Sequence, residues 1–192
     1  MVRMLSYGAL DAPIKPGTPK TPLCRLTSAA ASSSAVSVLE ACENQADLRL
    51  TLLRPSDEED TPPELKYVQQ TGVSGGSDAR VVAVTDTTTA VYIPPTPKPR
   101  VDIVDETGSV IASTVVPRAP APEATASRVG DLVTWWTGDS LMVFSANNLQ
   151  YKYTVAAAGD NAPRRSGGDH GGGRLMVPVS SGYDVFDPAT GG

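Results

Sequence analysis

The stretch that decides the fold covers residues 131–155 and reads DLVTWWTGDSLMVFSANNLQYKYTV. It contains three apolar runs separated by short polar turns, and each run has the length of a β-strand rather than of a helix. About forty residues later, residues 174–192 read RLMVPVSSGYDVFDPATGG and show a similar pattern. The stretch is therefore either a repeated structural unit, a catalytic segment, or both.

Pairs of apolar runs recur along the chain, at residues 34–55, 80–116, 131–155 and 174–192. Four apolar positions mark equivalent points of these units and lie 40 to 52 residues apart: Leu52, Val104, Phe144 and Phe186. Units of roughly 40 to 50 residues with several short strands each are typical of β-propellers. The sequence therefore predicts an all-β fold, an incomplete β-propeller of about four partial blades of antiparallel strands.

This interpretation divides the chain into an N-terminal extended segment, residues 1–33, and a partial β-propeller, residues 34–192. The four propeller repeats are predicted at residues 34–56, 79–117, 130–160 and 174–192. Residues 161–173 interrupt the pattern, because they are Gly-rich and charged and lack apolar alternation. We expect an irregular segment there, and we expect the chain to be incomplete because the fourth repeat stops after its second strand.

Alternation within the strands predicts that both faces of each blade are covered. In Leu132–Trp136, apolar side chains fall on both sides of the strand, as expected when blades stack face to face. Trp135 and Trp136 point to opposite sides, so at least one indole packs between blades. The other indole is a candidate for an interaction surface.

Two turns contain an Asp followed closely by a Gly, in DETG at residues 105–108 and DPATG at residues 187–191. An Asp at a strand end accepts hydrogen bonds from the backbone of the turn, and Gly supplies the positive φ that such turns need. We therefore predict that Asp105 and Asp187 cap turns, with Gly108 and Gly191 at positive φ. Metal binding is the alternative, but these carboxylates belong to different repeats.

Composition excludes several classes of protein. Among 192 residues, 17 are Gly and 17 are Pro, which suits short strands with frequent turns and not a helical bundle. The formal net charge of −5 argues against nucleic-acid binding. No apolar run is long enough to span a membrane, and the first residues lack the hydrophobic core of a signal peptide. As written, the chain would stay in the cytoplasm.

The two cysteines, Cys24 and Cys42, do not form a CxxC pair. With the single histidine of the chain, they do not make a convincing metal site. Two buried free thiols are one interpretation. A disulfide is the other, and it would indicate an oxidising compartment. The residues alone leave both open.

Four segments carry a resemblance to a known family: residues 77–92, 130–144, 151–155 and 174–191. They read SDARVVAVTDTTTAVY, GDLVTWWTGDSLMVF, YKYTV and RLMVPVSSGYDVFDPATG. They resemble an uncharacterised Ala/Val-rich conserved family of actinobacterial, mainly mycobacterial, proteins with a quinoprotein-alcohol-dehydrogenase-like (PQQ-like) β-propeller. The resemblance implies that this chain is a fragment, with a membrane anchor before it, further blades after it, and the propeller outside the cytoplasm. It therefore favours the disulfide between Cys24 and Cys42.

Catalytic chemistry has little support in the sequence. His170, the only histidine, lies between Gly-rich runs, and no Ser-His-Asp or Cys-His arrangement remains without it. A PQQ-dependent dehydrogenase needs a complete ring, calcium-binding carboxylates, a catalytic Asp and a Trp motif in each blade, whereas this chain has two adjacent Trp. We predict no catalytic, cofactor-binding or metal-binding residue and no cofactor, and expect that the protein is not an enzyme.

The predicted function is a non-enzymatic scaffold or interaction module of an envelope-associated protein. Its partner would be a protein bound to the propeller surface, without nucleic acid, and with membrane contact only through an anchor outside this sequence. The family resemblance places the full-length protein outside the cytoplasm. Two alternatives stay open: a fragment of a cofactor-binding or PQQ-dehydrogenase-like enzyme, and a truncated or frameshifted product without independent function.

Overall fold

The computed structural model describes residues 24–55, 65–74, 76–94, 97–122, 124–156, 174–179, 181–187 and 189–191. These residues form four antiparallel sheets, and the one helix among them is a short 3-10 turn, η1 (Gly76–Asp78). The protein is therefore all-β, as the sequence predicts.

The first two sheets have four strands each. The first sheet contains β1 (Cys24–Ala31), β2 (Val36–Cys42), β3 (Leu48–Pro55) and β4 (Leu65–Val73). The second sheet contains β5 (Arg80–Val84), β6 (Thr88–Ile93), β7 (Arg100–Asp105) and β8 (Val110–Val115). Within each of these sheets the order in space follows the order in the chain, and consecutive strands pair antiparallel.

The third sheet repeats this arrangement with β9 (Thr125–Val129), β10 (Leu132–Trp136), β11 (Ser140–Ser145) and β12 (Tyr151–Ala156). Among the described residues, the fourth sheet contains two strands, β13 (Leu175–Val179) and β14 (Gly182–Phe186). The opening stretch of residues 131–155 thus forms the last three strands of the third sheet.

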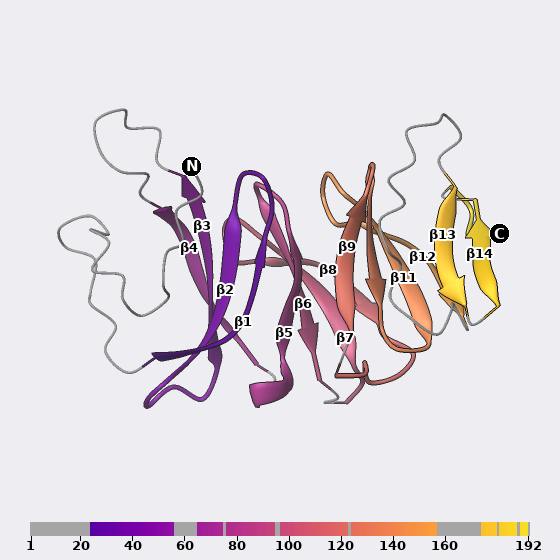
Figure 1. Ribbon diagram of the computed structural model, residues 1–192. Helices are drawn as coiled ribbons and strands as arrows, with labels where there is room; N and C mark the ends of the chain where they lie inside the picture. The colour runs from indigo at the N-terminus through magenta and orange to yellow at the C-terminus, as the bar shows by residue number, and fades with distance from the viewer. Residues whose placement is uncertain are drawn as a thin grey trace.

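The sheets lie side by side in chain order, with β1–β4 at one end and β13–β14 at the other (Figure 1). Their first strands are neighbours, because β1 packs against β5 and β5 against β9. A hydrogen bond of 3.0 Å from the Val81 N–H to Ser28 Oγ also joins β5 to β1. The described sheets do not close into a ring, so the architecture is an incomplete β-propeller, as predicted.

Stacking of the sheets follows directly from the alternation of side chains. On β10, Val133 and Trp135 pack against the second sheet, whereas Leu132 and Trp136 pack against the fourth. The interface between the first and second sheets joins Leu39, Leu48 and Leu50 to Val81, Val91, Ile93 and Val104. Each middle sheet therefore buries both faces, which gives the protein one core for each pair of neighbouring sheets.

The structure corrects the predicted boundaries. Residues 1–33 were predicted as an extended segment, but Cys24–Ala31 forms β1 and pairs with β2 along its length. Similarly, Thr125–Val129 forms β9, although the third repeat was predicted to begin at residue 130. Both strands are rich in Ala, Ser and Thr, so they lack the apolar alternation that identifies a strand.

Three of the four apolar positions that mark the predicted repeats fall on equivalent strands. Leu52, Val104 and Phe144 lie on β3, β7 and β11, the third strand of each sheet. Phe186 lies on β14, the later of the two described strands of its sheet, and the turn after β14 begins with Asp187 as the turn after β7 begins with Asp105. The irregular segment predicted at residues 161–173, with His170, lies outside the described residues.

In the part of the chain that the structure describes, no helix has the length and apolarity to cross a bilayer.

Trp135 offers a test of the stacking between the second and third sheets. Trp135→Ala should lower the free energy of unfolding by about 3–5 kcal/mol, because it removes the largest fully buried side chain and leaves a cavity. Urea denaturation of the purified chain measures this change. The matched control is Tyr183→Ala, at an exposed aromatic residue, which should change stability by about 0.5 kcal/mol or less. Equal effects of the two substitutions would contradict the stacking.

Candidate functional site

The two tryptophans do not form an interaction surface. Trp135 is 1% exposed and Trp136 is 4% exposed. The Trp135 ring packs at 5.7 Å between centroids against Tyr92 of the second sheet, and Trp136 is covered by the fourth sheet through Val177 and Phe186. The prediction of a surface at Trp135 and Trp136 is therefore wrong, because sheets stack on both sides of β10.

Cys24 and Cys42 lie opposite each other at one end of the β1–β2 pair, with their Cα atoms 4.0 Å apart. The structure joins them by a disulfide. The bridge closes a loop over a sequence separation of 18 residues and fixes β1, the Ser/Ala-rich strand, to its neighbour.

Asp105 and Asp187 cap turns, as predicted. Asp105 Oδ1 accepts hydrogen bonds from the Thr107 N–H at 2.8 Å and the Ser109 N–H at 3.0 Å. Asp187 Oδ1 accepts one from the Ala189 N–H at 2.7 Å. Gly108 and Gly191 have φ values of 87° and 77°, which is the left-handed region that favours glycine.

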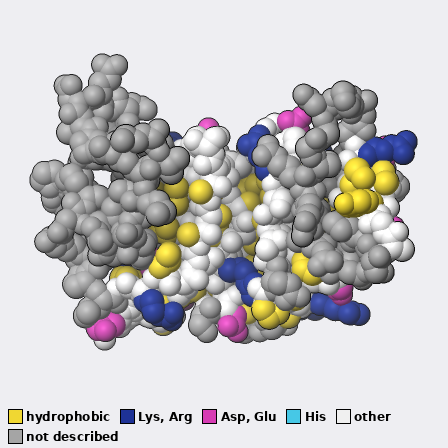
Figure 2. Space-filling model, in the orientation of Figure 1, with side chains coloured by type: hydrophobic (Ala, Val, Ile, Leu, Met, Phe, Trp, Pro, Cys, Tyr) yellow, Lys and Arg dark blue, Asp and Glu magenta, His cyan; other side chains and the backbone are white. Residues whose placement is uncertain are grey.

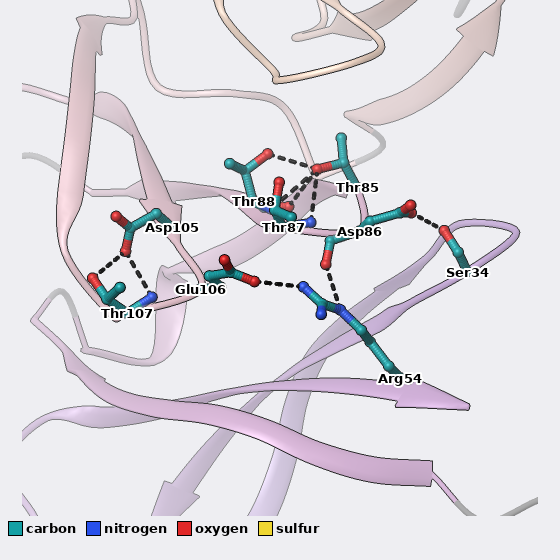
Figure 3. Close-up of polar contacts among 9 residues, drawn as sticks. All are labelled: Ser34, Arg54, Thr85, Asp86, Thr87, Thr88, Asp105, Glu106 and Thr107. Carbon is teal, nitrogen blue, oxygen red and sulfur yellow. Dashed lines mark hydrogen bonds and ion pairs between the residues drawn. The ribbon is translucent and has the colours of Figure 1, made fainter. Parts of the chain in front are cut away.

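A polar cluster joins the turns of the first two sheets (Figure 3). Arg54, near the end of β3, donates from Nε to the Asp86 carbonyl at 2.6 Å and from Nη2 to Glu106 Oε2 at 2.8 Å. Ser34 donates to the Asp86 carboxylate. Glu106 is paired with Arg54 and the Asp86 carboxylate with Ser34, so the cluster holds the first two sheets together.

The described residues contain no group of side chains suited to a metal centre. Within those ranges, no three His, Cys, Asp or Glu side chains come together in a way that could hold a metal ion. The first strands of the three four-stranded sheets, β1, β5 and β9, carry no Asp or Glu in their sequences. Ser, Thr, Ala and Val dominate these strands instead.

The outer edge of the second sheet is the candidate site. β8 reads VIASTV, and its Val110, Ile111 and Val115 are 58%, 56% and 58% exposed. Three of the six exposed large hydrophobic residues among those described are on this single strand. Its uncharged run between Gly108 and Pro117 is visible in the sequence, but alternation alone identifies only a strand and not its place at an edge.

A cavity of about 140 Å³ lies beside this edge, between the outer strands of the first and second sheets. Its apolar wall consists of Val73, Val91, Ile93, Val104 and Val110. Its polar wall consists of Arg100 and Asp102 of β7. The cavity therefore offers an apolar part and a polar part, formed by an ion pair, next to an exposed strand.

The polar wall is a small hydrogen-bonded group. Arg100 Nε donates to both carboxylate oxygens of Asp102 at 3.0 Å, and Ser113 Oγ on β8 donates to Asp102 Oδ1 at 2.6 Å. Asp102 is buried, whereas the Arg100 side chain is 29% exposed. Asp102 thus holds Arg100 in place and ties β7 to β8.

A second exposed apolar area lies on the fourth sheet. Figure 2 shows hydrophobic side chains over the end of the molecule formed by β13 and β14. Tyr183 and Val185 of β14 are 60% and 46% exposed there. This area is a flat sheet face without a described cavity, whereas β8 has both an edge and a cavity.

Comparisons with known proteins give a structural likeness alone. No protein-family model and no curated protein sequence matches the chain. Among solved structures, the chain is similar to the crystal structure of BamB from Moraxella catarrhalis, with 10% identity and a TM-score of 0.39. The match covers 86% of this chain and 62% of the BamB chain, so this chain spans less than two thirds of that structure. The fold assignment above rests on strand pairing and stacking within this chain.

The disulfide should contribute measurably to stability. Replacing both cysteines, as Cys24→Ser with Cys42→Ser, should destabilise the protein by about 3 kcal/mol, because the bridge restricts the unfolded chain over a loop of this length. Thermal melting with and without dithiothreitol measures the effect. The reductant should lower the melting temperature of the wild-type chain and leave the double variant unchanged. An equal fall in melting temperature of the wild-type chain and the double variant on reduction would contradict the disulfide.

Asp105 should make stability depend on pH. Hydrogen bonds, first from the Thr107 side chain and then from the backbone, lower the pKa of Asp105 below its ordinary value of 3.8. A carboxylate with a lowered folded pKa stabilises the protein above pH 3.8, and this contribution is lost as the pH falls through the lowered value. Asp105→Asn should therefore lower the melting temperature at pH 7. The difference in melting temperature from the wild type should shrink as the pH falls below 3.8.

Asp184→Asn is the matched control for this pH series. Asp184 is exposed on β14 and accepts no side-chain hydrogen bond from the described residues. Its substitution should therefore have little effect on the melting temperature at any pH of the series. A wild-type minus Asp105→Asn difference that stays constant down to pH 2 would contradict the role of the ionised Asp105.

Proposed function

We propose that this protein is a non-enzymatic β-propeller scaffold that binds a protein partner at the outer strand β8. The observation that carries the proposal is the exposure of Val110, Ile111 and Val115 on one uncharged strand. Scattered single hydrophobic residues are normal on a surface, whereas a contiguous group beside a cavity is typical of a binding site.

The composition of the first strands supports a scaffold over an enzyme. A propeller enzyme that uses its central channel needs acidic or amide side chains there to bind a metal or move protons. β1, β5 and β9, the neighbouring first strands, contain none of these residue types. The small and aliphatic side chains on these strands favour packing.

An extracytoplasmic, envelope-associated location belongs to the same proposal. The disulfide between Cys24 and Cys42 supports it, because structural disulfides persist in oxidising compartments. The resemblance to the actinobacterial PQQ-like family supports it as well, since that family implies an anchored propeller outside the cytoplasm.

Photocrosslinking in the source organism tests the scaffold function. With a photoreactive residue at Ile111, irradiation should give a discrete adduct between this chain and one protein, since Ile111 is exposed on β8. The same residue at Lys152, exposed on the outer strand β12, is the control and should give no such adduct. Val115→Lys in the Ile111 protein should abolish the adduct, because it places a charge on the apolar edge.

Two results would overturn the proposal. The first is an adduct pattern that is the same at Ile111 and Lys152. The second is saturable binding of PQQ with calcium to the purified chain together with alcohol-dependent dye reduction, which would favour the enzyme alternative.

A further inference from the structure

We propose that β8 binds an extended segment of a partner protein as an added antiparallel strand, with apolar side chains in the cavity beside Val110 and a carboxylate on Arg100. The inference rests on the proposed scaffold function and specifies the chemistry of the partner segment.

The edge of β8 is suited to strand addition. β8 is the last strand of its sheet and pairs with β7 alone among the described strands. Its outer edge therefore presents backbone N–H and C=O groups to which another extended chain can pair. Proteins protect such edges with Lys or Pro, and β8 contains neither, whereas β12 at the edge of the third sheet contains Lys152.

The cavity supplies selectivity for side chains. Val110 faces the same side of the sheet as its register partner Val104, and both line the cavity. An added strand presents every second side chain to this side. Apolar residues at those positions would lie next to Val110, at the end of the cavity nearest the edge of the sheet.

At the other end of the partner segment, Arg100 favours a residue with a carboxylate. Arg100 uses Nε on Asp102, and the described residues provide no hydrogen bond to its Nη1 and Nη2 atoms. Arg100 is the register partner of Val115, so a cation lies beside the far end of β8. A carboxylate of the partner segment is the group that guanidinium nitrogens bind best.

The charge of Arg100 also favours a partner protein over a second copy of this chain as the occupant of the edge. β8 has no carboxylate of its own, so pairing of two β8 strands would leave both Arg100 side chains without an added anion. The four residue steps from Arg100 to Val104 span roughly 13 Å along the strand. A segment with Asp and two Val at alternate positions covers that distance with all three side chains on one face.

Fluorescence anisotropy with a labelled peptide tests the proposal. The probe is Gly-Asp-Thr-Val-Thr-Val-Lys-Gly, in which Asp precedes the Val residues as antiparallel pairing requires. We expect saturable binding to the full chain. We expect the Asn version of the probe to bind about tenfold more weakly, because it loses the charged contact with Arg100. Val115→Lys should weaken binding of the Asp probe by about tenfold or more.

The matched control is Tyr183→Lys, which places the same charge on an equally exposed hydrophobic residue of β14 and should leave the affinity unchanged. Melting curves check that both Lys variants fold, and the comparison of Asp and Asn probes does not depend on any variant. Hydrogen exchange should show new protection at residues 110–115 when the Asp probe is bound, and none in β14.

Failure to bind the Asp probe, equal binding of the two probes, or equal loss in the two Lys variants would each overturn the proposal. A concentration-dependent dimer that Val115→Lys abolishes, without peptide binding, would identify a second copy as the occupant and also overturn it. The scaffold function has a separate test, since a crosslinked adduct at Ile111 without peptide binding supports the scaffold and rejects this mode of binding.

Discussion

Burial of both faces of each middle sheet is the constraint on which the structure depends. A single sheet of short strands cannot bury enough apolar surface on its own, and each neighbour that stacks on it covers one face. On β11, Leu141 and Val143 face one neighbour while Met142 and Phe144 face the other. The core is thus distributed over the interfaces between sheets, and removal of one sheet exposes the face of the next.

Among the described residues, every buried polar side-chain atom has a hydrogen-bond partner. The Ser37 and Thr89 hydroxyls form a buried hydrogen bond of 2.6 Å between the first and second sheets. Arg54 makes its contacts at the rim, where its side chain is 31% exposed and Glu106 is 49% exposed. An ion pair of that exposure contributes about 0–1 kcal/mol, so it orients the turns while apolar packing supplies the stability.

The sequence predicts this architecture to the extent that each strand carries apolar alternation. β10 and β11 are recognisable because their residues are apolar on both faces, and the Asp-Gly turns at Asp105 and Asp187 follow from local chemistry. β1 and β9 were not predicted as strands, because the first strands of the sheets pack near one another with small Ser, Ala and Thr side chains. Such strands lack apolar alternation. The burial of Trp135 and Trp136 depends on sheets that are distant in sequence, so residues around β10 alone could not determine it. The site at β8 was missed for the same reason, since an edge is a property of the sheet and not of the strand.

Stacking of the sheets covers most of their faces and so limits the surfaces to which a partner protein can bind. Interior faces are occupied by neighbouring sheets, and the first strands present small side chains without carboxylates. Among the described residues, stacking leaves open the strand edges, the turns and the faces of the end sheets. Among the described edges, β8 combines exposed valines with a cation whose position is fixed by a buried carboxylate.

Asp102 would be costly to bury alone, and the hydrogen bonds from Arg100 and Ser113 offset that cost. The same three residues therefore connect the stability of the second sheet to the chemistry at its edge, because Ser113 belongs to β8 and Arg100 faces the cavity.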